Sequence, residues 1–239
     1  MPSDVLGEFF GTMILILLGD GVVAGVLLGK SKAKDAGWIA VTAGWAFAVM
    51  AGVYTSRAIG GPGFINPVGP FVGVLHNSLA IDKALSFVLA ELLGAFTGAF
   101  LVWLHYHPHW AETPDPDLKR AVFCTSPAIR DYPSNLMSEA IATFALVFIG
   151  TAVVEKGING ALAAPLGGAL VWGIGLSLGA TTGYAINPAR DFGPRCAHAV
   201  LPIPGKGGSD WEYAWVPIVG PLIGAAVAAF LVKAVIVST

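Results

Sequence analysis

Long stretches without a charged side chain alternate with short polar segments along most of this chain. The uncharged runs cover residues 36–56, 58–81, 92–111, 157–189 and 213–232. A helix needs about 20 largely apolar residues to cross the hydrocarbon core of a bilayer. The runs therefore predict several membrane-spanning helices, and they argue against a soluble domain with a large buried core.

The apolar runs and the polar segments between them predict six spanning helices. The first begins near Asp4 and Glu8, without the basic start and cleavage pattern of a signal peptide, so we expect it to be retained. Residues 105–133 hold three histidines, several acids and five prolines, which predicts one long aqueous loop. The expected spans are about 4–28, 36–56, 83–104, 134–154, 161–181 and 212–235, with the turn before the fifth at Glu155, Lys156, Asn159 and Gly160.

Two further apolar segments are interrupted by glycine and proline and cannot be unbroken helices. The first, 58–81, contains Asn66-Pro67, and the second, 183–201, contains Asn187-Pro188. Asparagine as a cap followed by proline at the first helical position is typical of a helix start. Each segment is therefore expected to enter the membrane as an irregular loop and return as a half-helix.

The order of three spans, with a half-helix after the second, occurs twice. Residues 7–12 resemble residues 138–143, and Gly94 and Gly98 correspond to Gly220 and Gly224 at the spacing that brings helices close together. An odd number of spans inverts the second copy in the membrane, so the half-helices meet by their N-termini near the midplane. The expected fold is an all-α membrane protein with six transmembrane helices and two re-entrant half-helices, one domain over 1–239 with repeats of about 1–106 and 134–239 joined by loop 107–133.

Irregular backbone at this depth is tolerated where it is buried in protein or lines a wet cavity. The glycine-rich segments 60–63 and 181–184 would supply a ladder of carbonyl acceptors there. Asn66 and Asn187 would add N–H donors, and the two helix N-termini a positive potential. Such a wall orients water or hydroxyl groups and repels cations, protons included.

Composition narrows the function further. Only 12% of residues are charged and 55% are hydrophobic, with a mean hydropathy of +0.73. Thirteen basic against fifteen acidic residues leave no basic surface for nucleic acid. No nucleophile–base pattern, phosphate loop or metal set is evident, so we expect neither an enzyme nor a cofactor. The alternating His105, His107 and His109 lack the helical or finger context of a metal site, and Cys124 and Cys196 make no disulfide framework.

The chain resembles the aquaporin (major intrinsic protein) family, in its bacterial glycerol facilitator branch. The motif most specific to that family is Asn187-Pro188-Ala189-Arg190-Asp191-Phe192-Gly193-Pro194-Arg195. The resemblance covers the whole chain, although the first motif departs from the family's Asn-Pro-Ala. The resemblance implies that two motifs meet at the pore midplane: Asn66, Pro67, Val68, Asn187, Pro188 and Ala189. It also implies a pore-lining backbone: Gly63, Phe64, Ile65, Gly183 and Ala185.

The same resemblance implies a selectivity filter made of Trp45, Gly175, Tyr184 and Arg190. Trp45 and Tyr184 would form an apolar corner for a carbon backbone, while Arg190 donates hydrogen bonds to hydroxyl groups. Gly175 would leave room that a histidine fills in water-selective members. Structural support is implied for three acids: Glu8 and Glu139 as acceptors for the re-entrant loops, and Asp191 as a stabiliser of a loop.

Two features of the charge pattern leave questions open. Asp20 lies in the first span without a counterpart in the second half, and it either lines a vestibule or pairs with polar backbone near the outer end. The family places both termini in the cytoplasm, which puts a cluster of Lys30, Lys32 and Lys34 outside. The positive-inside bias predicts the reverse orientation. We follow the resemblance because it extends over the whole chain.

The resemblance implies a passive channel in the plasma membrane for glycerol and similar small neutral solutes, with some water, assembled as a homotetramer. One alternative is a channel for undissociated lactic acid or other small organic acids, drawn by the positive potential around Arg190. A second is a proton-coupled secondary transporter with Asp20, Glu8 and Glu139 as proton carriers, because inverted repeats with half-helices occur in transporters too.

Overall fold

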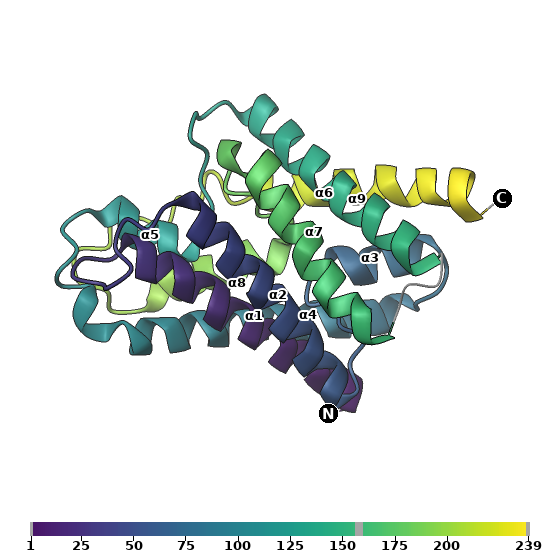
Figure 1. Cartoon of the computed structure of the whole chain (residues 1–239), viewed down its shortest axis with the longest axis horizontal. Helices are drawn as coiled ribbons and strands as arrows, with labels where there is room; N and C mark the ends of the chain where they lie inside the picture. The colour runs from purple at the N-terminus through teal and green to yellow at the C-terminus, as the bar shows by residue number, and fades with distance from the viewer. Residues whose placement is uncertain (1, 156–159, 238–239) are drawn as a thin grey trace.

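The computed structural model describes residues 2–155 and 160–237, and these residues form helices and connecting turns without a strand. Six segments in this part are long and apolar enough to cross a membrane. Figure 1 shows the helices, which are α1 (Ser3–Leu27), α2 (Trp38–Ile59), α3 (Val68–Leu75), α4 (Ile81–His105), α5 (Pro116–Phe123), α6 (Tyr132–Glu155), α7 (Ala163–Leu178), α8 (Pro188–Val200) and α9 (Val216–Val232).

The predicted spans agree with the structure to within a few residues, with one error in the long loop. Residues 105–133 include the helix α5, which the sequence analysis assigned to loop. The Asp115 side chain accepts a hydrogen bond from the Asp117 N–H at 2.8 Å, and Pro116 occupies the first turn. This is a standard helix start that the Pro-rich composition concealed. The turn expected at Lys156 and Asn159 lies outside the described residues.

Glycines let the long helices approach each other in both halves. A Cβ atom at Gly98 would lie 2.5 Å from the Met13 carbonyl oxygen, so α4 can pack this closely on α1 only with glycine there. A Cβ atom at Gly220 would lie 2.7 Å from the Glu139 side chain, between α9 and α6. Small residues at such contacts are the usual means of helix packing in membranes.

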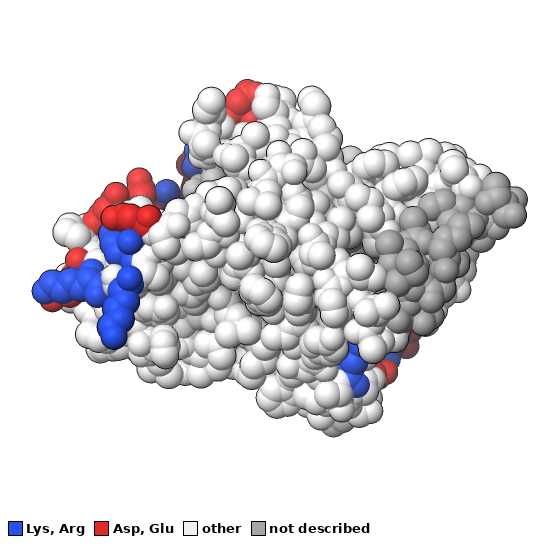
Figure 2. Space-filling model, in the orientation of Figure 1, with Lys and Arg blue, Asp and Glu red and all other residues white. Residues whose placement is uncertain are grey.

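The outer surface of the bundle is apolar, and the charges lie near its ends. Figure 2 shows most lysine, arginine and acidic side chains on the left, where Figure 1 places α5 and the turn after α1. Large apolar side chains such as Phe47, Leu85 and Phe230 are exposed on the helices. An apolar belt between charged ends matches a helix bundle surrounded by lipid.

The half-helices α3 and α8 follow the two irregular loops and meet inside the bundle. The Asn66 side-chain N–H donates to the Ile186 carbonyl at 2.9 Å, and the Asn187 side-chain N–H donates to the Ile65 carbonyl at 2.8 Å. These reciprocal hydrogen bonds join segments about 120 residues apart. In Figure 1 the N-terminus and the end of α9 lie on the side of the molecule away from α5.

Candidate solute pore

Three cavities follow one another through the centre of the bundle. The outer one has a volume of about 480 Å³, the central one about 130 Å³ and the inner one about 310 Å³. Trp45, Tyr184 and Arg190 line both the outer and the central cavity. Phe64 and Asn66 line both the central and the inner cavity. The shared residues mark the two narrow places of a single path.

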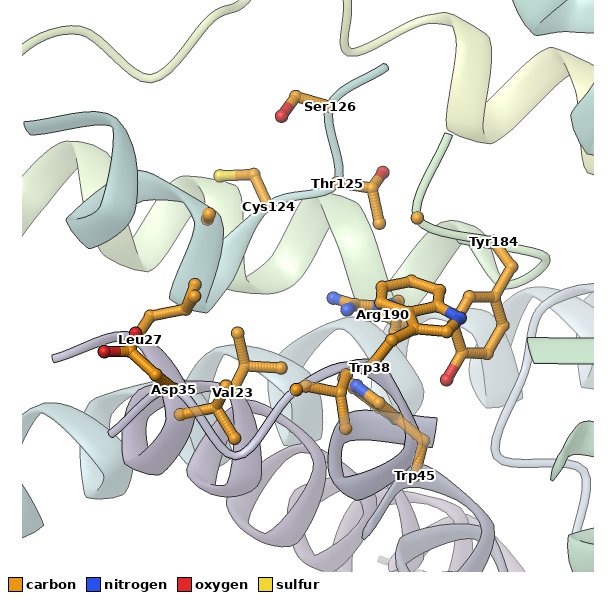
Figure 3. A pocket seen from close by; sticks show the side chains of 15 residues that line it. Val23, Leu27, Asp35, Trp38, Trp45, Cys124, Thr125, Ser126, Tyr184 and Arg190 are labelled. Atoms are coloured by element: carbon orange, nitrogen blue, oxygen red, sulfur yellow. The ribbon is translucent and has the colours of Figure 1, made fainter. Parts of the chain in front are cut away.

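Trp45 and Arg190 form one side of the outer narrow place. The Arg190 guanidinium lies over the Trp45 ring, 4.1 Å from its centroid, which is a cation–π contact. The Trp45 ring fits because Gly19 of α1 lies behind it, where any Cβ atom would collide with the indole. Figure 3 shows Arg190, Trp45 and Tyr184 grouped with Trp38 among the side chains that line the outer cavity.

Tyr184 occupies the space that Gly175 leaves open. A Cβ atom at Gly175 would lie 2.9 Å from Tyr184 Cζ and 3.0 Å from its hydroxyl oxygen. Gly175 therefore lies behind the tyrosine ring and does not line the outer or the central cavity. Trp38, which was not singled out from the sequence, contacts both Gly175 and Tyr184. Its Nε1–H donates a hydrogen bond to the Gly175 carbonyl at 3.0 Å, and its ring lies edge-on to the Tyr184 ring.

The Arg190 side chain keeps donors available for a solute. Its Nη1 donates a long hydrogen bond of 3.4 Å to the Phe123 carbonyl and lies 3.5 Å from Asp20 Oδ1. Within residues 2–155 and 160–237, neither Nε nor Nη2 has a protein acceptor. The Tyr184 hydroxyl is likewise buried without a hydrogen-bond partner in the described chain. The narrow place thus combines two aromatic rings with unused polar groups.

The two asparagines cap the half-helices and also face the central cavity. Asn187 Oδ1 accepts hydrogen bonds from the N–H groups of Ala189 at 3.0 Å and Arg190 at 3.2 Å. Asn66 Oδ1 accepts from the Val68 N–H at 3.0 Å. Since each amide has two N–H bonds and the opposite loop takes one, one N–H of each asparagine remains for a solute.

The irregular loops leave carbonyl groups unpaired along the path. Phe64, Ala185 and Tyr184 line the central cavity, and Gly183 lines the outer one, whereas Gly63 lines neither. In the part of the chain that the structure describes, none of these carbonyls accepts a backbone hydrogen bond. Pro67 and Pro188 lie elsewhere, on an apolar groove with Phe71 and Leu92. Val68 lines the inner cavity, and Ala189 is buried in the core.

Two glutamates hold the loops in a strained conformation. Ile65 and Ile186 have positive φ angles of 46° and 44°, which β-branched residues rarely adopt. The Ile65 N–H donates to Glu8 Oε2 at 2.6 Å, and the Ile186 N–H donates to Glu139 Oε2 at 2.9 Å. Strain of this kind persists only where surrounding contacts fix it. Glu8 also accepts from the Gly63 N–H, so its oxygens serve the loop.

Glu91 is a buried carboxyl group that the sequence analysis missed. Its Oε1 accepts the Asn66 N–H at 3.1 Å, and its Oε2 has no partner among the described residues. The carboxyl group lies beside that of Glu8, so two acids support the first loop and one supports the second. The sequence did contain a signal for Glu91, because it is a single acid in the middle of the apolar span 83–104.

Asp191 links α8 to the segment after α5. Its Oδ2 accepts from the Thr125 N–H at 2.8 Å and the Thr125 hydroxyl at 2.6 Å. Its Oδ1 pairs with Arg195 Nε at 2.8 Å. Both side chains of this ion pair are fully buried, and Asp191 lines none of the three cavities.

A second ion pair fastens the outer turns together. Arg130 donates two hydrogen bonds to the Asp210 carboxylate, at 3.0 and 2.6 Å, and so joins the turn before α6 to the one before α9. Partial burial alone would raise the pKa of Asp210, but the hydrogen bonds and charge of Arg130 outweigh it and lower that pKa below its usual value. In the turn after α4, the His109 Nδ1–H donates a hydrogen bond to the Gly29 carbonyl at 2.9 Å.

A bundle of six membrane-length helices, with two half-helices meeting beside a line of cavities, defines a membrane channel. Residues 2–232 match the family described as Major intrinsic protein, and the chain belongs to this family. This membership confirms the resemblance read from the motifs.

Named relatives and a solved structure cover nearly the whole chain. The chain is 53% identical to the probable glycerol uptake facilitator protein of Thermotoga maritima, over 96% of this chain and 97% of the relative. It is 52% identical to glycerol uptake facilitator protein 3 of Lactiplantibacillus plantarum, over 97% and 96%. It is 37% identical to the D/L-lactic acid transporter of the same organism, over 96% of both. The X-ray structure of the aquaglyceroporin from Plasmodium falciparum matches with a TM-score of 0.85 and 27% identity, covering 98% of this chain and 96% of that one.

Proposed function

We propose that the protein is a passive channel for glycerol and similar small neutral solutes, with some water. The observation that carries the proposal is the outer narrow place, where the rings of Trp45 and Tyr184 lie beside an arginine with unused donors. A small polyol has carbon atoms along one edge and hydroxyl groups along the other. It therefore fits a passage that is apolar on one side and polar on the other.

In this mechanism the protein replaces the water that a solute leaves behind. Arg190 Nε and Nη2 donate to hydroxyl oxygens, while the carbonyls of Tyr184 and Ala185 accept from hydroxyl hydrogens. An unpaired polar group in a dry site costs about 1–3 kcal/mol, so paired hydroxyls lower the barrier to passage. Farther in, the free N–H groups of Asn66 and Asn187 donate hydrogen bonds to the solute's hydroxyl oxygens, and Phe64 contacts the carbon atoms of the solute.

The same groups account for the exclusion of cations. Each half-helix contributes the equivalent of about +0.5 charge at its N-terminus, and the two N-termini meet beside the central cavity. A protonated water or a metal ion meets a positive potential over the whole central cavity. Donors that orient water at the junction also interrupt a proton-conducting chain.

The named relatives support this function and its setting. Two of them are called glycerol uptake facilitators and are more than half identical to this chain over almost all of its length. We place the protein in the plasma membrane as a homotetramer, with both termini in the cytoplasm. Exposed apolar side chains on α2 and α7, such as Phe47 and Trp172, suit contact with lipid or a second subunit. Light scattering of the purified protein measures the subunit number.

Glycerol flux into liposomes that contain the purified protein tests the proposal. A channel gives a rate that rises linearly with the glycerol gradient. Saturation at millimolar glycerol, or uphill accumulation driven by a proton gradient, would overturn it in favour of a coupled transporter. For two of its three proposed proton carriers the geometry speaks against that transporter, because the oxygens of Glu8 and Glu139 already accept hydrogen bonds from the loops.

Undissociated lactic acid is the second candidate solute. A relative with 37% identity is named a D/L-lactic acid transporter. The positive ends of the half-helices attract carboxylates into the pore, where the free donors of Arg190 can bind them. Lactic acid flux that disappears above neutral pH, in liposomes that glycerol never enters, would favour this acid channel. Comparable glycerol flux at every pH supports the polyol channel.

A further inference from the structure

The two halves of the protein differ in charge at several corresponding positions, and one such pair lies at the outer narrow place. Glu8 and Glu139 correspond, so Asp20 corresponds to Thr151; Asn66 and Asn187 correspond, so Arg190 corresponds to Gly69. Gly69 and Thr151 both line the neutral inner cavity. Their counterparts Arg190 and Asp20 meet at the outer narrow place, 3.5 Å apart. These two departures from the repeat, Asp20 and Arg190, therefore form a pair of opposite charges.

Asp20 is placed to act on Arg190 and on little else. Its side chain is fully buried, and neither carboxylate oxygen accepts a hydrogen bond within the described residues. It lines none of the three cavities of the path, so it does not touch a passing solute. The neighbouring acid Asp191 is already paired with Arg195. A carboxylate without donors is costly to bury unless a cation compensates it, and Arg190 is that cation.

Arg190 in turn lies between two contacts that fix its side chain. Trp45 covers one face of the guanidinium, and Asp20 faces Nη1. The single hydrogen bond to the Phe123 carbonyl is long, at 3.4 Å, and holds the group only weakly. Asp20 is thus the acidic side chain that faces Nη1, and its charge offsets that of Arg190 at the narrow place.

We propose that Asp20 is a positioning residue that determines specificity by neutralising Arg190. With the pair intact, the narrow place offers directed donors without a net positive charge, which favours neutral polyols. Without Asp20 the net charge becomes positive, and small carboxylates are concentrated at the filter, where their protonated form can pass. This inference rests on the proposed channel function and concerns its choice of solute.

The test compares the Asp20→Asn variant with the parent protein in liposomes. Lactic acid and glycerol fluxes are measured on the same preparation between pH 5 and 8, at low and high salt. The ratio of acid to glycerol flux is expected to rise about three- to tenfold in the variant and to fall back at high salt, because an unbalanced charge concentrates anions. An unchanged ratio, including an equal loss of both fluxes, would show a purely structural role and overturn the proposal.

Glu112→Gln is the matched control, since it also removes one carboxylate from the outer end. Glu112 pairs with Lys30 at 2.7 Å on the surface, away from Arg190. Its loss should leave the flux ratio as in the parent. The same increase in both variants would indicate a general surface effect and contradict the specific pairing.

A double variant tests whether Asp20 acts through the arginine. In an Arg190→Gln background, Asp20→Asn should leave the flux ratio unchanged, whereas a further threefold increase would contradict the proposal. If Asp20→Asn fails to fold, Asp20→Val removes the same charge without burying a polar group and is expected to give the same rise. A parent protein with no glycerol flux above empty liposomes would refute the proposed function instead, so the two failures are distinguishable.

Discussion

In the proposed pore, single residues determine specificity in two ways. Some donate hydrogen bonds to the solute, and glycines leave room for the aromatic rings that line the path. Gly19 gives room to the Trp45 ring, and Gly175 gives room to the Tyr184 ring. Ile65 and Ile186 accept an unfavourable φ so that adjacent carbonyls face the path.

Gly175→Ala should reduce glycerol flux severalfold and leave water flux nearly unchanged. The new methyl group would lie 2.9 Å from Tyr184 Cζ, so the ring must shift toward the path and narrow it. Gly173→Ala on the same helix is the control, because no atom lies within 4 Å of the position that its Cβ would take. Stopped-flow light scattering compares both variants with the parent. Equal glycerol rates in all three would refute the filter assignment; Gly175→His should have a still stronger effect.

Glu139→Gln should destabilise the protein by about 1–3 kcal/mol, the usual cost of unpaired buried hydrogen-bonding groups. Glu139 accepts from the N–H groups of Ala185 and Ile186 and from the Thr182 hydroxyl, and an amide cannot accept at both positions. Thr143→Val, one turn along the same helix, removes a buried hydroxyl that has no partner in the described structure. It should be nearly neutral. Thermal unfolding in detergent measures both, and equal stability of the two variants would contradict the assigned role.

Among the helices, the spans were predictable from hydropathy, because a helix surrounded by lipid needs about 20 consecutive apolar residues and such runs are visible in the sequence. The half-helices were predictable from Asn66-Pro67 and Asn187-Pro188, whose chemistry is local. Helix α5 was not, because its start at Asp115 lies in a stretch whose composition is that of a loop. The contact of Asp20 with Arg190 was also beyond sequence reasoning, since it joins residues 170 positions apart.

The Arg130–Asp210 pair makes the outer turns sensitive to acid. Because the pKa of Asp210 is lowered in the folded protein, the pair contributes stability above the unfolded pKa of about 3.9 and loses it as the pH falls through the lower, folded value. Asp210→Asn should lower stability at neutral pH by up to about 1 kcal/mol, because the partly exposed arginine is screened by water. Unfolding temperatures of parent and variant should converge once the pH falls below the folded pKa of Asp210. A difference that persists or grows in acid would contradict this account.

At the scale of the whole molecule, one inverted repeat builds both ends of the path. The halves agree in their paired asparagines and in Glu8 and Glu139, and they differ where Arg190 and Asp20 stand in place of Gly69 and Thr151. We infer that the repeat supplies the scaffold and that this departure from it contributes to the proposed filter. The lysine-rich turn after α1 lies near α5, away from the chain ends (Figure 1), so termini in the cytoplasm would place this turn outside.

We propose that glycerol crosses this protein passively through the path between Trp45, Tyr184 and Arg190. The most direct measurement is the rate at which glycerol enters protein-containing and empty liposomes across a range of temperatures. We predict a rate well above that of empty liposomes, with an activation energy clearly lower than that of diffusion through lipid. A rate equal to that of empty liposomes, or an activation energy as high as that of the lipid pathway, would contradict the claim.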